Sequence, residues 1–254
     1  MERLALSRRR SSETSLDVTV EYGAGRLYVS PTSDGSLYRM RLDYDEARTE
    51  PLAEYRAGEL RVGAVGRDGG RGSGRREGGE MRLELADGLP MELELEFGAA
   101  RAQLDLGGLA LTGLQVRTGA SESRLDVSRP NRARLERASF EIGAAEFTAT
   151  RLGNLSAAEI EVSTGVGKVT LDLTGEWRRD AHVSVEMGLG KLELILPRDL
   201  GVRLVEDTFL TTLDAPGLVK RGDAYESPGW DTAERRVTID VQAAFGSIVV
   251  AWVQ

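Results

Sequence analysis

One motif recurs along the chain: an apolar residue, two further residues, a glycine, two small residues and then alternating apolar positions. From residue 98 to residue 188 the motif glycines are 21, 24, 22 and 23 residues apart. Apolar residues before and after each glycine keep the same offsets, and a period of two indicates strands with one buried face. We call these residues the corner glycines: Gly23, Gly98, Gly119, Gly143, Gly165 and Gly188.

A repeat of about 22 residues that holds two or three short strands is typical of one coil of a β-solenoid. We therefore predict an all-β chain, folded as a single-domain parallel β-solenoid (a right-handed β-helix) with about 22 residues per coil. Leu125, Leu171 and Leu194 should then lie over one another. Each corner glycine is expected to turn the chain with a positive φ. An antiparallel β-sandwich is the alternative, although it does not require equivalent residues at a fixed spacing.

The motif recurs less regularly at both ends of the chain. We predict a disordered N-terminal arm over residues 1–15 and a solenoid domain over residues 16–253. Within it, residues 16–97 form irregular N-terminal coils with a Gly/Arg loop at 65–80. Residues 98–206 form regular coils, and residues 207–253 form a C-terminal capping segment and the last coil. Atypical terminal units are expected because a solenoid otherwise exposes its core and strand edges.

Composition excludes several kinds of function. The chain has 254 residues and no Cys, which excludes disulfides, thiolate chemistry and zinc fingers. Its single histidine, His182, makes a Ser-His-Asp site improbable and is expected on the surface. A net charge of −8 argues against bulk nucleic-acid binding. No apolar run approaches the roughly 20 residues of a membrane span.

The run from Leu104 to Ser121 resembles the core signature of bacterial toast-rack proteins, relatives of the cell-wall-active antibiotic response (LiaF-type) proteins. The repeated corners TGAS, TGVG and MGLG fit the same signature, and the segments 225–228 and 243–248 are similar to the end of that domain. The resemblance covers most of residues 16–253. It implies a parallel β-helix at the bacterial cell envelope, often tied to envelope-stress signalling, and it brings no catalytic residues. Members that inhibit a sensor kinase carry N-terminal membrane helices, which are absent from this sequence.

Outward positions offer a few candidate sites. Asp105, Asp126 and Asp172 occupy one offset, so their like charges need neutralising, by a Ca²⁺ ion or by Arg117 or Arg124. Asn131 and Asn154 share a second corner, where they form either an amide stack or two independent turns.

Aromatic residues and a Gly/Arg tract supply the remaining candidates. Trp252 is predicted in the core, and the candidate surface-binding residues are Trp177, Trp230 and Tyr225. The segment 68–76 is similar to RNA-binding Arg/Gly segments but is more simply a flexible loop. Arg8–Arg10 would give only weak attraction to an anionic membrane.

The sequence thus predicts a non-enzymatic, envelope-associated β-helix scaffold or binding module. Expected partners are a protein or a second copy at the solenoid ends, near a membrane, with no nucleic acid, metal or cofactor. A regulatory partner of an envelope-stress sensor kinase is one alternative, and a carbohydrate-active enzyme is another. The expected location is the cell envelope if a leader was removed, and otherwise the cytoplasm.

Overall fold

The computed structural model describes residues 1–67 and 79–253, which form an all-β fold with one short 3₁₀ turn. Most of the predicted Gly/Arg loop, residues 68–78, lies outside the described residues. The elements are β1 (Glu2–Arg9), β2 (Leu16–Thr32), β3 (Ser36–Tyr44), β4 (Thr49–Arg56), β5 (Glu59–Gly66), β6 (Gly79–Ala86), β7 (Pro90–Asp105), β8 (Ala110–Thr118), β9 (Glu122–Asp126), β10 (Arg137–Thr150), η1 (Leu152–Leu155), β11 (Glu159–Asp172), β12 (Ala181–Pro197), β13 (Gly201–Thr208), β14 (Thr211–Asp214), β15 (Val219–Arg221), β16 (Ala224–Glu226) and β17 (Arg236–Val253).

The middle of the molecule is a parallel stack in the register that the motif predicts. Strand β11 pairs in parallel with β10 on one side and with β12 on the other. Leu171 therefore lies between Ala149 and Leu194, and Leu125 is the next member of the same column. Each of these four side chains is at most 1 % exposed. Inward side chains from successive repeats thus build a continuous apolar column, as expected from their alternation.

The long strands bend at the corner glycines, so each contributes to two faces that share one core. Pairing of β11 with β12 skips from Thr164 to Val166, which places Gly165 at the bend. The first half of β10 pairs with β8 and its second half with β9. Buried apolar residues from both halves belong to one hydrophobic cluster along the molecule.

The predicted positive φ at the corner glycines was wrong. Positive φ occurs two residues later, at Gly167 (155°) and Gly190 (149°), and also at Gly25 and Gly246. A Cβ at Gly190 would collide with the carbonyl oxygen of Gly167 in the neighbouring repeat. At Gly190 the need for glycine therefore comes from a close backbone approach just after the bend.

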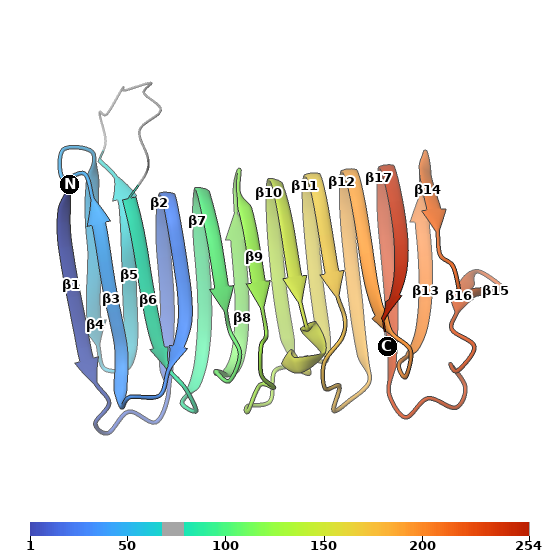
Figure 1. Ribbon diagram of the computed structural model, residues 1–254, viewed down its shortest axis with the longest axis horizontal. Helices are drawn as coiled ribbons and strands as arrows, with labels where there is room; N and C mark the ends of the chain where they lie inside the picture. Colours follow the sequence, from blue (N-terminus) through green and yellow to red (C-terminus); the bar gives the residue numbers. More distant parts are fainter. Residues whose placement is uncertain (68–78, 254) are drawn as a thin grey trace.

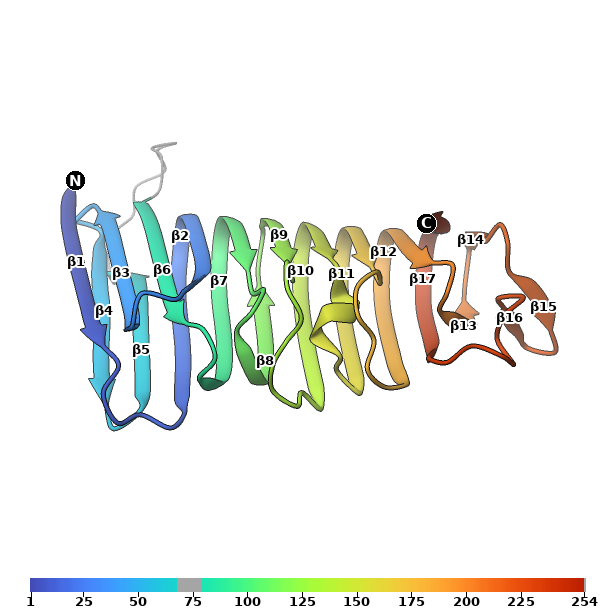
Figure 2. The same ribbon diagram turned by 60° about the horizontal axis from the view of Figure 1, so that its bottom comes forward.

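The order of strands in space departs from the sequence at both ends (Figures 1 and 2). Strand β17 pairs with β12 on one side and with β13 and β14 on the other, so the last long strand lies inside the row. At the opposite end, β2 lies between β7 and the pair β5 and β6. The spacing of the motif fixes which residues stack but does not by itself fix which repeats are neighbours. Short antiparallel strands then cover the ends, with β1 on β3, β4 on β5 and β15 on β16.

The prediction of a disordered arm over residues 1–15 was also wrong. Residues 2–9 form β1, which pairs antiparallel with β3. Leu4 and Leu6 alternate inward and lie against the core. The arm is ordered because these two leucines cover apolar surface that the terminal repeat would otherwise expose.

Candidate functional site

The structure removes Trp177 from the candidate surface-binding residues. Its side chain is 8 % exposed, and its indole Nε1–H donates to the carbonyl oxygen of Leu173 at 2.8 Å. The ring folds back over the loop toward Gly153, where a Cβ would collide with the indole nitrogen. Proximity to a turn predicted exposure, but the indole closes the core under that turn.

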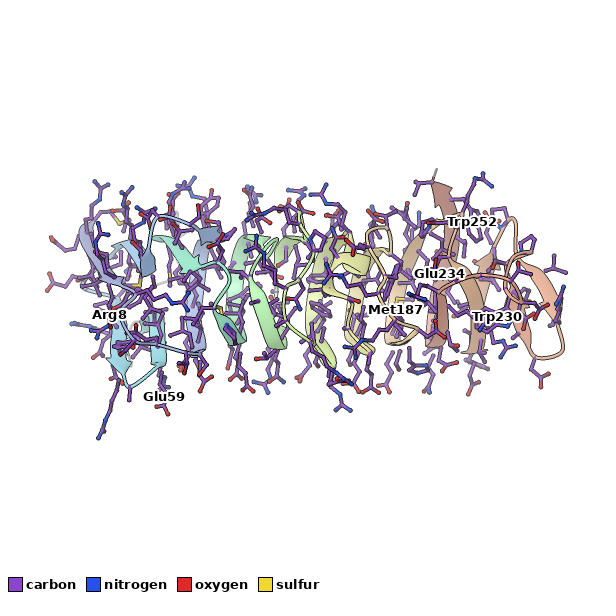
Figure 3. The ribbon with its side chains drawn as sticks, turned by 90° about the horizontal axis from the view of Figure 1, so that it is seen from below. Arg8, Glu59, Met187, Trp230, Glu234 and Trp252 are labelled. Atoms are coloured by element: carbon purple, nitrogen blue, oxygen red, sulfur yellow. The ribbon has the colours of Figure 1, made fainter. Side chains whose placement is uncertain are left out.

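Trp230 and Tyr225 lie at the C-terminal end of the molecule, as the label of Trp230 in Figure 3 indicates. The guanidinium carbon of Arg203 is 4.5 Å from the centre of the Trp230 ring, and that of Arg236 is 5.9 Å away. The Lys220 ammonium lies 5.3 Å from the Tyr225 ring. Both rings are therefore already engaged by cations, and these contacts hold the end of the fold together.

Trp252 is half-buried, in contrast to the core position expected for it. Its indole Nε1–H donates to the carbonyl oxygen of Pro216 at 2.6 Å, so the ring anchors the segment between β14 and β15. Its neighbour at the next inward position, Val250, is 2 % exposed. Alternation placed Trp252 inward, but β14 pairs with β17 only as far as Val249, so it does not reach Trp252 to cover the ring.

The neighbouring carboxylates of the predicted aspartate ladder are stabilised by hydrogen bonds and by one ion pair. Asp105 and Asp126 are direct strand neighbours. Asp105 accepts from the Ser128 hydroxyl at 2.7 Å, and Asp126 accepts from the Thr150 hydroxyl and forms an ion pair with Arg151. The expected screening residues are engaged elsewhere: Arg124 with Glu122, and Arg117 with Glu94 and Glu141. Residues 1–67 and 79–253 contain no cluster of three or more potential metal-binding side chains.

The outward side chains that precede the bend form one surface, which we call the acidic face. These side chains come from parallel neighbours β5, β2, β7, β8, β10, β11, β12, β17 and β13. Twelve are carboxylates: Asp17, Glu21, Glu59, Glu92, Glu94, Glu96, Glu141, Glu159, Glu161, Glu186, Asp207 and Asp240. Only four are arginines: Arg61, Arg117, Arg137 and Arg203. This excess of eight carboxylates equals the net charge of the whole chain (−8), so the negative charge is concentrated on one face.

A shallow groove of about 990 Å³ crosses the acidic face between β2 and β12. Its carboxylates differ in their ion pairing. Glu21 and Glu161 form ion pairs with Arg61 and Arg137. Within the described part of the chain, Glu96 and Glu186 have no ion-pair partner. The groove therefore holds negative charge that its own cations do not neutralise.

Hydrogen bonds stabilise the charged form of two arginines on this face. A side-chain hydrogen bond to Glu21, with the Coulombic attraction of its carboxylate, raises the pKa of Arg61 above its ordinary value. The same contacts from Glu159 raise the pKa of Arg137. His182 lies at the edge of the face, with its Nε2 3.2 Å from an oxygen of Asp240. It is only partly exposed and lies between Glu159 and Thr238 of the neighbouring strands.

The acidic face was missed because outward acids looked scattered along the sequence. A signal was present, since Glu21, Glu96, Glu141 and Glu186 all stand two positions before a corner glycine. Parallel stacking turns that common offset into a row across the strands. The carboxylates can attract and orient a cationic partner.

Comparison with known proteins identifies the family. The chain matches the family described as the N-terminal domain of toast_rack (DUF2154) over residues 6–150 and 139–195. It is a member of the toast-rack family. No curated protein matches this toast-rack chain. None of the helices in residues 1–67 and 79–253 has the length and apolar character needed to cross a membrane.

Solved structures resemble the chain at low sequence identity. A proposed cell adhesion protein from Clostridium sporogenes is 19 % identical, with a TM-score of 0.53 and 99 % of each chain covered. A proposed adhesin from Bacteroides fragilis is 10 % identical, with a TM-score of 0.42, and covers 98 % of this chain and 97 % of its own. At 19 % identity, the likeness to the Clostridium sporogenes protein shows a shared fold alone.

Proposed function

We propose that this toast-rack chain is a non-enzymatic scaffold of the cell envelope that binds a cationic partner along its acidic face. We also infer that it winds as a right-handed β-helix of about 22 residues per coil, which would hold the face rigid. The observation that carries the proposal is the groove, where Glu96 and Glu186 lie exposed among ion-paired carboxylates.

The rigidity of the face supports a binding role. Every outward row is backed by side chains that are almost completely buried, such as Val162 and Val185 between the outward positions of β11 and β12. Spacing of about 4.8 Å between strands fixes the distances between charges in a row. A surface that is already ordered loses little conformational entropy when a partner binds.

The ion pairing of the groove fits attraction better than acid–base chemistry. Arg117 contacts Glu94 and Glu141 on either side, and Arg61 contacts Glu21. These contacts arrange the carboxylates in rows across the strands, and rows of like charge steer an oppositely charged partner. The envelope location draws support from the toast-rack family and from the neighbour described as a proposed cell adhesion protein.

Binding can be tested with a fluorescently labelled oligolysine peptide, with oligoglutamate as the matched probe. We expect saturable binding of oligolysine that weakens as salt is raised, and no binding of oligoglutamate. Replacing both Glu96→Gln and Glu186→Gln should weaken oligolysine binding, whereas Glu46→Gln, in an exposed turn away from the groove, should not. Equal binding of both peptides, or an unchanged affinity in the double variant, would refute the cationic partner.

The proposed location needs a separate measurement. An antibody against the folded domain should detect the protein in the envelope fraction of the source cells, and should label intact cells or protoplasts. Detection only in the soluble cytoplasmic fraction would contradict an envelope role. It would not affect the peptide-binding result, which tests the acidic face separately.

A further inference from the structure

A second row of outward side chains lies at the bend itself. The residue after each corner glycine is small in the first repeats, as at Ala24, Ala99 and Ala144. In the later repeats this position holds Val166, Leu189 and, after Ala244, Phe245. These three are direct strand neighbours, and they are 51, 50 and 44 % exposed.

The turn between β13 and β14 extends this row by two more large apolar side chains. Phe209 and Leu210 are 65 and 71 % exposed. The backbone N–H of Phe209 donates to the carbonyl oxygen of Ala243 at 2.9 Å, which fixes the turn on β17. The Phe209 ring meets Phe245 edge-on, with 5.9 Å between ring centres. We call Val166, Leu189, Phe209, Leu210 and Phe245 the corner ridge.

Leu210 takes a left-handed conformation with a φ of 48°. A bulky residue with positive φ is strained, and such strain persists where the surroundings impose it. In this turn the strained conformation goes with two large apolar side chains, Phe209 and Leu210, that point into solvent. A contiguous exposed apolar strip of this kind marks an interaction surface.

Opposite charges flank the two sides of the corner ridge. Lys168 and Lys191, two of the three lysines of the chain, lie two positions after the ridge residues of β11 and β12. Glu186 and Asp207 lie on the other side, at the border of the acidic face. Lys191 and Glu186 belong to the same strand, so they stand at about the same height along the molecule.

We propose that the corner ridge is the contact surface for a second copy of this chain, with the long axes of the two copies parallel. A twofold axis along the ridge places each ridge residue against its own counterpart. It also places the lysine side of one copy against the carboxylate side of the other, so that Lys191 meets Glu186 of the second copy. The ridge is thus self-complementary in both shape and charge, as an isologous dimer requires.

The charge pattern favours a second copy over other occupants. The opposite twofold arrangement, with antiparallel axes, would place lysines against lysines and carboxylates against carboxylates, which is unfavourable. An anionic membrane would meet Glu186 and Asp207 on one side of the ridge. Five apolar side chains form a small contact, so the dimer should be weak and depend on protein concentration.

Crosslinking tests the parallel arrangement, because the chain has no Cys of its own. Val166→Cys, Leu189→Cys and Phe245→Cys should each give a covalent dimer with a short thiol-reactive crosslinker. Val219→Cys, equally exposed at 55 % but on β15, should not. A crosslink at only one of the three ridge positions would indicate antiparallel ridges, and no crosslink at any of them would rule out the contact. Either result overturns the proposal.

Sedimentation over a range of concentrations tests the contribution of each part of the surface. Leu189→Ser with Phe245→Ser should raise the dimer dissociation constant by about tenfold or more, because it removes two apolar contacts together from the middle of the ridge. Val219→Ser should leave it unchanged. Lys191→Glu or Glu186→Lys should each weaken the dimer, and the double exchange should restore it, because the reversed pattern is again complementary.

Other results would overturn the proposal. A wild-type chain that stays monomeric at every concentration, or that dimerises equally well as the double serine variant, excludes the ridge contact. Monomeric protein that instead sediments with neutral phosphatidylcholine vesicles would show that lipid is the occupant. Circular dichroism and thermal unfolding of each variant check that the exposed substitutions leave the fold intact.

Discussion

Asn131 and Asn154 lie in neighbouring repeats, and the backbone N–H of Asn131 donates to the carbonyl oxygen of Asn154 at 2.7 Å. Both side chains are buried and bind backbone groups of the adjacent turns. The Asn131 amide pairs with both backbone groups of Leu111, and the Asn154 amide joins Val127 and Glu176. The two asparagines thus tie three repeats together where the chain leaves the strands.

Replacing either asparagine by alanine should destabilise the fold. Asn154→Ala would leave the carbonyl oxygen of Val127 and the N–H of Glu176 without their side-chain partner. Buried groups left unpaired cost about 1–3 kcal/mol. Urea unfolding should detect this loss, with exposed Gln103→Ala as the control. An Asn154→Ala variant as stable as the control would mean that water replaces the amide freely.

Leu171→Ala should lower the free energy of unfolding by about 2–5 kcal/mol, because it opens a cavity in the column between Ala149 and Leu194. Val166→Ala removes apolar atoms from the same strand at an exposed position and should change stability by less than about 0.5 kcal/mol. Chemical denaturation of both variants makes the comparison. Similar losses in the two would contradict the inward assignment of Leu171.

Glycine substitutions should show whether stability depends more on the glycine at the bend or on the glycine two residues later, where neighbouring backbones approach closely. Gly190→Ala combines a strained positive φ with a clash against the neighbouring backbone, so we expect a loss of about 2–5 kcal/mol. Gly119→Ala has no positive φ, and its Cβ would lie 3.5 Å from the nearest atom, so it should be tolerated. Thermal unfolding of the two variants makes the comparison. If Gly119→Ala were the less stable of the two, the result would favour the left-handed corner glycine that the motif predicted.

The position of the positive φ, two residues after the corner glycines, shows what the sequence could not predict about the fold. Fixed offsets around the corner glycines predicted the stacking of Leu125, Leu171 and Leu194, because identical register in parallel strands requires it. They could not predict that β17 lies between β12 and β13, because the last repeat carries the same signals wherever it inserts.

The surface features, too, were predictable from the sequence only in part. The acidic face was encoded in the common offset of its glutamates, but it becomes a surface only when the strands stack. Trp177 was assigned to the surface because a turn precedes it, and only tertiary contacts reveal that the ring closes the core. Sequence periodicity reports which face a strand residue occupies, and it says little about residues in the connecting loops.

Two threonines inside the bend offer a stabilising substitution. The hydroxyls of Thr118 and Thr164 are buried without a hydrogen-bond partner in the described residues. Thr164→Val keeps the shape and removes an unpaired polar group, so stability should stay equal or rise by up to about 1 kcal/mol. Thr150→Val is the matched control, since its hydroxyl donates to Asp126 at 2.8 Å and its loss should destabilise. The unfolding midpoints of the two variants make the comparison. A clear loss of stability in Thr164→Val would mean that the Thr164 hydroxyl does have a hydrogen-bond partner.

The N-terminal end should give the fold an acid-sensitive component through Glu13. Its carboxylate accepts from the backbone N–H of Ser11 at 2.6 Å and from the Tyr55 hydroxyl at 2.9 Å. Backbone hydrogen bonds, first that from Ser11, lower the pKa of Glu13 from 4.5 to about 2. Between these values the unfolded chain binds a proton that the folded chain does not. This part of the stability is therefore present above pH 4.5 and is lost as the pH falls toward 2.

Glu13→Gln should remove that component. The variant is expected to be less stable than the wild type near neutral pH, and the difference should shrink as the pH falls from about 4.5 toward 2, where the wild-type carboxylate becomes protonated. Tyr55→Phe, which removes one of the hydrogen bonds, should show the same trend with a smaller amplitude. Urea unfolding across this range measures both. A difference that stays constant with pH would mean that Glu13 contributes through packing of the segment against Tyr55 and Arg8 rather than through its charge.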